Sequence, residues 1–213
     1  MKIDGVLISD GNRKLGGIPS VSLHPRLSCG KGCTSPLLCM KDCYAMRMLD
    51  YSSVAPSWTE NYRIWQADWD LYRGSIETFL TKRAPERFRW HVGGDIPSTD
   101  YLDMIITIAE EFPKTRFRAF TKADKFLPDQ HPKLPNLKIG ISHWPGMTVR
   151  PGLTGYTHSW IVPNAASKAV KEGRLADADY KIPKSAHPCP GNCETCDSCW
   201  ALRAGSHTKF EQH

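Results

Sequence analysis

The fold is decided around the stretch Phe88-Arg89-Trp90-His91-Val92-Gly93-Gly94-Asp95-Ile96-Pro97, where an alternating segment meets an abrupt break. Alternation over residues 88–92 predicts a strand, which the Gly-Gly-Asp-Ile-Pro segment ends. The apolar spacing of residues 99–112 then predicts an amphipathic helix with an inward face formed by Leu102, Ile105, Ile106 and Ala109. Further strands are expected at residues 116–120, 137–142 and 160–163. Strands and helices that alternate in this way indicate parallel βα units.

Upstream of this stretch, the sequence predicts a short strand at residues 17–23 and one long helix from Ser57 to Arg83. Ser57 would cap the start of the helix, with Glu60 completing a capping box. Aromatic residues recur at steps of four and three along one face of this helix: Trp58, Tyr62, Trp65, Trp69 and Tyr72. Such a stripe is typical of a buried core face.

The length of 213 residues indicates one domain, or one domain with an appendage. A full eight-unit βα barrel needs roughly 250 residues, so we expect an α/β fold with a partial βα barrel over residues 1–176. Residues 177–213 are expected to form a cysteine-rich tail packed on the barrel. No apolar stretch is long enough for a transmembrane helix, and the first residues lack a signal-like segment. We therefore expect a cytoplasmic protein without a membrane partner.

Eight cysteines fall into two compact groups. The N-terminal group is Cys29, Cys33, Cys39 and Cys43, and the C-terminal group is Cys189, Cys193, Cys196 and Cys199. In a reducing compartment, two groups of four thiols predict metal ligands rather than disulfides. The close C-x₃-C-x₂-C-x₂-C spacing of the C-terminal group favours a [4Fe-4S] cluster over zinc. The N-terminal group is looser, with C-x₃-C-x₅-C-x₃-C spacing, and zinc stays open there as the alternative metal.

Several polar residues follow the predicted strands and would meet at one edge of a parallel sheet. Gly93, Gly94 and Asp95 follow one strand, Lys122 follows the next, and His143 follows the third. The two glycines would let a ligand approach the backbone, and the carboxylate could bind an ammonium group. The alternatives are a simple turn at the glycines, a helix cap at Asp95, a solvated Lys122 and a hydrogen-bonded loop histidine.

The combination of a cysteine loop and a Gly-Gly-Asp segment resembles the radical S-adenosylmethionine enzymes. These enzymes are partial barrels with a three-cysteine loop after the first strand and a Gly-Gly-Glu-type segment after the second. Cys33, Cys39 and Cys43 with Gly93-Gly94-Asp95 look like that pair, although the spacing is C-x₅-C-x₃-C instead of C-x₃-C-x₂-C. The usual spacing occurs instead at Cys189, Cys193 and Cys196. The resemblance implies a cluster that binds S-adenosylmethionine, with Asp95 receiving its amine. Lys122 and His143, which follow the next two strands, are expected to take part in binding the cofactor.

Longer segments resemble the bacteriophage gene product eighty-eight family, in the order in which that family has them. They are Gly11-Asn12-Arg13-Lys14-Leu15-Gly16-Gly17-Ile18-Pro19-Ser20, Cys43-Tyr44-Ala45, His91-Val92-Gly93-Gly94-Asp95-Ile96-Pro97, Ala119-Phe120-Thr121-Lys122, Trp144-Pro145-Gly146 and Cys189-Pro190-Gly191-Asn192-Cys193. The resemblance implies a phage protein that works in the cytoplasm of the host cell. It supplies no substrate.

The expected function is therefore that of a phage-encoded iron–sulfur protein of the radical S-adenosylmethionine type. Such an enzyme would carry one or two [4Fe-4S] clusters and would need an electron donor such as a flavodoxin or ferredoxin. Two alternatives stay open: a non-catalytic iron–sulfur electron carrier, and a Cys₄ zinc module that binds nucleic acid or a host protein. The net charge of +6 permits contact with nucleic acid, but the basic residues are scattered and do not indicate it.

Overall fold

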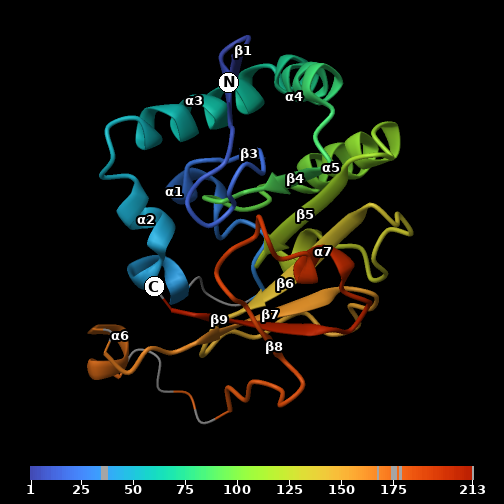
Figure 1. The fold of residues 1–213 in the computed structure, drawn as a ribbon. Coiled ribbons are helices and arrows are strands. Elements are labelled where there is room, and N and C mark those ends of the chain that lie inside the picture. The colour runs from blue at the N-terminus through green and yellow to red at the C-terminus, as the bar shows by residue number, and fades with distance from the viewer. Residues whose placement is uncertain (35–37, 167, 174–176, 178, 213) are drawn as a thin grey trace.

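Large apolar and basic side chains alternate along the central strands and give the sheet two different faces. The structure, a computed structural model, describes residues 1–34, 38–166, 168–173, 177 and 179–212. Its strands are β1 Lys2–Ile3, β2 Val6–Ser9, β3 Ser20–Val21, β4 Arg87–Trp90, β5 Arg116–Thr121, β6 Leu137–His143, β7 Thr157–Val162, β8 His187–Pro188 and β9 His207–Glu211. Its helices are α1 Pro25–Ser28, α2 Tyr44–Met48, α3 Val54–Ala67, α4 Trp69–Arg83, α5 Thr99–Glu111, α6 Lys168–Lys171 and α7 Ser198–Ala201, with 3₁₀ turns η1 Leu38–Asp42 and η2 Asp124–Phe126 (Figure 1).

The strands form one mixed sheet in the order β1-β2-β3-β4-β5-β6-β7-β9-β8. β1, β2 and β3 pair antiparallel, whereas every neighbouring pair from β3 onward is parallel. The expected α/β class with parallel strands is thus confirmed. Because neighbours in sequence are neighbours in the sheet from β3 to β7, the loops that leave these strands emerge at one common edge.

The long helix expected from Ser57 to Arg83 is two helices. The chain leaves the helical conformation at Asp68, whose carboxylate accepts a hydrogen bond from the Leu71 N–H and caps α4. Ser57 lies inside α3, which begins at Val54, so the expected cap at Ser57 is wrong. The break also divides the aromatic stripe, because Trp65 and Tyr72 are buried while Trp69 is exposed. None of the helices in the described ranges combines the length and the apolar character needed to cross a lipid bilayer.

The main core lies on the face of the sheet that carries Phe88, Trp90 and Phe117. These rings pack together and against apolar residues of α3, α4 and α5. The helix expected at residues 99–112 is α5, and its residues Leu102, Ile105 and Ala109 are buried there. Burial of large aromatic side chains contributes most of the stability at such an interface.

The opposite face of β4 and β5 carries arginines instead. Arg87 lies beside Arg116, and Arg89 lies beside Arg118, in the parallel register of the two strands. Chain from both ends of the molecule covers this face, where Leu15, Ile18 and Trp200 form a small separate core. The last strand, β9, joins the main sheet between β7 and β8, so two short pieces of the expected tail, residues 187–188 and 207–211, form part of the sheet.

Asn61 connects α3 to the antiparallel edge of the sheet. Its fully buried amide accepts a hydrogen bond from the Leu7 N–H at 2.7 Å and donates to the carbonyls of Leu7 and Ser22 at 2.9 and 3.0 Å. These three bonds satisfy backbone groups of β2 and of the residue after β3 that would otherwise be buried without partners.

Replacing Asn61 should therefore destabilise the protein markedly. We expect Asn61→Ala to lower the free energy of unfolding by about 2–4 kcal/mol, because three buried backbone groups lose their partner. Gln66→Ala on the exposed side of the same helix is the matched control and should change it by less than about 0.5 kcal/mol. Urea unfolding of both variants checks this, and equal effects would contradict the role given to Asn61.

Candidate functional site

The N-terminal cysteine group follows β3 directly. Cys29 ends α1, Cys33 lies in the following loop, Cys39 lies in η1, and Cys43 precedes the first residue of α2. Cys33 and Cys39 are buried, and Cys39 packs in a small apolar cluster with Trp144. Short helical turns thus place four thiols at the edge of the sheet where the parallel strands end.

Burial dominates the chemistry of these thiols. It raises the pKa of Cys33 to about 12, with the Asp95 carboxylate adding to the rise and Lys122 opposing it. Burial likewise raises the pKa of Cys29 and of Cys39, again against the influence of Lys122. Thiols in this setting stay protonated unless a strong positive charge is bound, and a metal ion would displace their protons.

Lys122 lies among these cysteines rather than in solvent. Burial lowers its pKa, whereas Cys39 and Cys43, when ionised, and Asp95 raise it. Its ammonium group is therefore stabilised beside the Asp95 carboxylate and beside any thiolates that form. A fixed positive charge at this position favours any anionic group that the thiols hold.

The Gly93-Gly94-Asp95 segment packs against the start of the cysteine loop. A Cβ at Gly93 would lie 2.2 Å from the Trp58 ring, and one at Gly94 would lie 2.6 Å from the Leu23 carbonyl oxygen. Gly94 also has a φ of +87°. Both glycines are thus required by the close contact of this turn with α1 and α3.

Asp95 is buried with its carboxylate extensively hydrogen-bonded. It accepts bonds from the Thr121 hydroxyl at 2.5 Å, the Ile96 N–H at 2.8 Å and the Lys122 N–H at 2.9 Å. The cap of α5 is Ser98, whose hydroxyl accepts from the Tyr101 N–H, so Asp95 does not cap that helix. Asp95 instead ties the end of β5 to the turn after β4, next to the cysteines.

His143 ends β6 in a cluster of aromatic rings. Its ring stacks on Trp160 with centroids 3.9 Å apart, and its Nε2 lies 3.0 Å from Nδ1 of His158. Burial lowers the pKa of His143 to about 4, and the charge of Lys122 acts in the same direction. His143 is therefore neutral at pH 7 and within the electrostatic reach of the cysteine site. The sequence did not single out His158 or its stacking neighbour His207.

The C-terminal group lies against the arginine face of the sheet. Arg87 donates to the carbonyl oxygens of Cys193 and Glu194 at 2.9 and 3.2 Å, and the Cys193 N–H donates to the Lys14 carbonyl at 2.7 Å. All four cysteines of the group line one cavity, together with Trp200 and Thr208. The fold thus gathers these thiols without any part from the N-terminal group.

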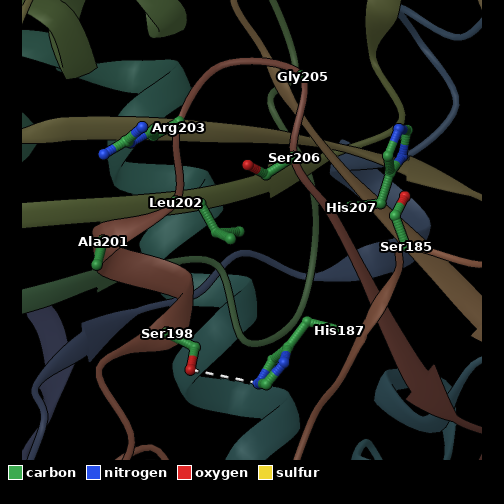
Figure 2. A pocket seen from close by; sticks show the side chains of 9 residues that line it. All are labelled: Ser185, His187, Ser198, Ala201, Leu202, Arg203, Gly205, Ser206 and His207. Carbon is green, nitrogen blue, oxygen red and sulfur yellow. Dashed lines mark hydrogen bonds between the residues drawn. The ribbon is translucent and has the colours of Figure 1, made fainter.

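An open cleft of about 510 Å³ lies next to this cavity (Figure 2). His187 and Ser198 line both spaces, and their side chains face each other with Nε2 and Oγ 3.4 Å apart. Cys196 Sγ lies 3.4 Å from the same hydroxyl. The cleft therefore gives access to the C-terminal group from the side of His187.

Tyr44 and Arg89 interact electrostatically with each other, Tyr44 also with the N-terminal group and Arg89 with the C-terminal group. The Tyr44 hydroxyl donates to the Val92 carbonyl oxygen, and burial raises its pKa while Arg89 opposes the rise. Burial lowers the pKa of Arg89, and Tyr44, Cys193 and Cys199 act in the opposite direction. Neither residue was singled out from the sequence, although the repeated Arg-Phe-Arg triplets were a signal that could have found Arg89.

The thiols of the two groups match a thiolate-bound metal in residue type. All eight cysteines are free thiols. Within the described ranges, no three His, Cys, Asp or Glu side chains stand close enough together to form a ligand set. The thiols are nevertheless grouped in fours, with a positively charged side chain beside each group, which suits an anionic centre.

His91 makes the stability of the site region dependent on pH. It is 3% exposed, with Nε2 3.0 Å from the Tyr101 hydroxyl, and burial followed by Arg89 lowers its pKa to about 3. In the unfolded chain, the pKa of His91 is near 6.5, so as the pH falls its imidazole takes up a proton in the unfolded state first. We expect the free energy of unfolding to fall by about 2 kcal/mol between pH 7 and pH 5 through His91. In His91→Gln this dependence should shrink by that amount in urea titrations, and an unchanged slope would contradict it.

The comparisons with known proteins show one family. No curated protein and no solved structure matches the chain. A family model described as Gene product 88 matches residues 6–202, which includes both cysteine groups and the strands from β2 to β8. Because this match covers most of the sequence, the chain belongs to the gene product 88 family.

Proposed function

We propose that this phage-family protein is an iron–sulfur enzyme of the radical S-adenosylmethionine type, with a cluster at each cysteine group. That the sheet is the wall of a partial βα barrel is part of the proposal. It is supported by the run of parallel strands β3 to β7, each next to its neighbour in sequence, which is how the wall of a βα barrel is built.

One observation carries the proposal above the others. The N-terminal thiols, the Gly93-Gly94-Asp95 turn and Lys122 lie together at the edge where β3, β4 and β5 end. The turn is held directly on α1, since the Asp95 N–H donates to the Ser28 hydroxyl, one residue before Cys29. Ligands of parallel α/β sheets bind at this edge.

Each residue then has a distinct part in the proposed site. Cys33, Cys39 and Cys43 would hold the cluster, which when bound supplies one electron for the reductive cleavage of S-adenosylmethionine. Lys122 would offset the negative charge of the thiolates, and Asp95 would offer its carboxylate to the methionyl amine. The packing of Cys39 on Trp144 would keep water from that side of the thiols.

The C-terminal group would hold a second cluster with all four of its thiols. Its cavity is bordered by the cleft at His187 and Ser198, which would admit an electron donor such as a flavodoxin or ferredoxin to that side. Tyr44 and Arg89, which influence each other electrostatically, link this group to the first one. Electrons entering at the C-terminal group would pass on to the nucleotide site.

Asp95 distinguishes the enzyme from an electron carrier. Asp95→Asn should weaken S-adenosylmethionine binding by about ten- to a hundredfold, because a charge-assisted contact is lost. It should also cost about 1–3 kcal/mol of stability, since the new amide would meet the Lys122 N–H, donor against donor. Calorimetric titration of the anaerobic, reconstituted protein measures the affinity. Asp100→Asn, exposed on the first turn of α5, is the control and should bind like wild type.

Two results of this titration would count against the proposal. If wild type binds no S-adenosylmethionine at millimolar concentration, the radical-enzyme function is wrong, and an electron carrier or a zinc module takes its place. If Asp95→Asn loses stability but keeps full affinity, the nucleotide binds elsewhere.

Removing the metal should loosen one part of the chain first. Residues 187–200 are held by the short pairing of β8 with β9, by Arg87 and Arg116, and by few other hydrogen bonds. Metal ligation would therefore be part of their folding free energy. Hydrogen exchange after chelation should therefore speed up at least about tenfold there. Strand β9 should stay protected because it pairs with β7. Equal protection of residues 187–200 with and without metal would show that the thiols bind none.

A further inference from the structure

Arg118 is buried in the middle of the sheet without a partner. Its side chain is 0% exposed, and none of its three guanidinium nitrogens has a hydrogen-bond partner in the described part of the chain. A buried charge with five unused donors is strongly unfavourable unless an anion offsets it. The neighbouring position makes room for it, since a Cβ at Gly140 would lie 2.6 Å from Arg118 Nη2.

The nearest charged neighbour of Arg118 on this face is another cation. Arg89 lies in register with it on β4, and the two guanidinium groups lie 4.1 and 4.2 Å from the centroid of the same Phe120 ring. Among the described residues no carboxylate forms an ion pair with either arginine. Arg89 donates to the carbonyl oxygens of Trp90 and His91, whereas Arg118 has no hydrogen-bond partner. Two adjacent cations without a carboxylate partner, one of them fully buried, indicate a site for an anion.

The group that faces this pair is the C-terminal cysteine group. Helix α7, which contains Cys199, contacts β5, and Arg87 fixes the preceding residues through their carbonyls. Burial raises the pKa of Cys199, and Arg118 is the largest influence in the opposite direction. Four thiolates around a divalent metal or a [4Fe-4S]²⁺ core leave a net charge of about −2, which two arginines would balance.

We propose that Arg118, together with Arg89, is the buried counter-charge of an anionic four-thiolate metal centre at the C-terminal group. The guanidinium N–H groups of Arg118 would donate to the sulfurs of that centre. This inference rests on the part of the proposed function that places a metal at the C-terminal group, and it applies to iron–sulfur and to zinc alike.

The test compares metal retention with stability in the full-length chain. Wild type, Arg118→Met and Arg118→Lys are loaded anaerobically, either with iron and sulfide or with zinc alone, and metal release to a chelator is followed over time. The kinetic phase of metal release that is absent in the Cys193→Ala/Cys196→Ala variant is assigned to the C-terminal group. Lys138→Met, which removes one positive charge at the adjacent register position on β6, is the control.

Opposite signs are expected in the two measurements. Arg118→Met should release the C-terminal metal about ten- to a hundredfold faster, while the N-terminal metal and the Lys138→Met control keep wild-type rates. Without metal, Arg118→Met should unfold at the same urea concentration as wild type or a higher one, because an unpaired buried charge is gone. Arg118→Lys should retain the metal to an intermediate extent. In the protein loaded with iron and sulfide, Arg118→Met should also lower the midpoint potential of the cluster, because the reduced cluster loses a neighbouring positive charge. The change is about 59 mV for each tenfold fall in the equilibrium constant for one-electron reduction.

Three results would overturn the inference. The first is that Arg118→Met releases metal at the wild-type rate. The second is that metal-free Arg118→Met is less stable than wild type or does not fold. The third is that the C-terminal group binds neither an iron–sulfur cluster nor zinc. If the C-terminal group binds zinc but no iron–sulfur cluster, the iron–sulfur function is wrong. The role of Arg118 is then supported if Arg118→Met releases zinc faster than wild type, and it is wrong if the two release zinc at the same rate.

Discussion

Two Arg-Phe-Arg triplets lie side by side in parallel register, at residues 87–89 of β4 and 116–118 of β5. The alternation of a strand sends the two phenylalanines into the aromatic core and the four arginines to the other face. A slip of one residue would bury arginines among the aromatic rings. The register therefore fixes both the core and the surface on which the C-terminal cysteines rest, since Arg87 and Arg116 bind that segment directly.

The two cysteine groups differ in the setting that the fold gives them. The N-terminal group lies at the ends of parallel strands, beside Lys122 and the hydrogen-bonded Asp95, where a ligand of an α/β sheet binds. The C-terminal group lies on the face of the sheet that carries Arg89 and Arg118, neither of which has a carboxylate partner among the described residues. Under the proposed function, this difference would suit a ligand-binding centre at the first group and an electrostatically balanced centre at the second.

The sequence was sufficient for the parallel strands β3 to β7, for α5 and for the proximity of Asp95 and Lys122, because apolar periodicity and strand ends are local signals. It failed where a single polar side chain decided the outcome, as at Asp68, which divides one expected helix into two. It also missed β9, whose residues His207-Thr208-Lys209-Phe210-Glu211 are too polar to resemble a strand without their partner β7. Arg118 escaped notice because only the structure shows that it is buried and unpaired.

The most direct test of a metal centre at each cysteine group is the metal and sulfide content of the protein purified without oxygen. We expect about eight iron atoms and about eight acid-labile sulfides per chain, with absorbance near 400 nm, as two [4Fe-4S] clusters require. The Cys193→Ala/Cys196→Ala variant should keep half of each. Zinc without sulfide, or loss of all iron in that variant, would contradict two independent iron–sulfur centres.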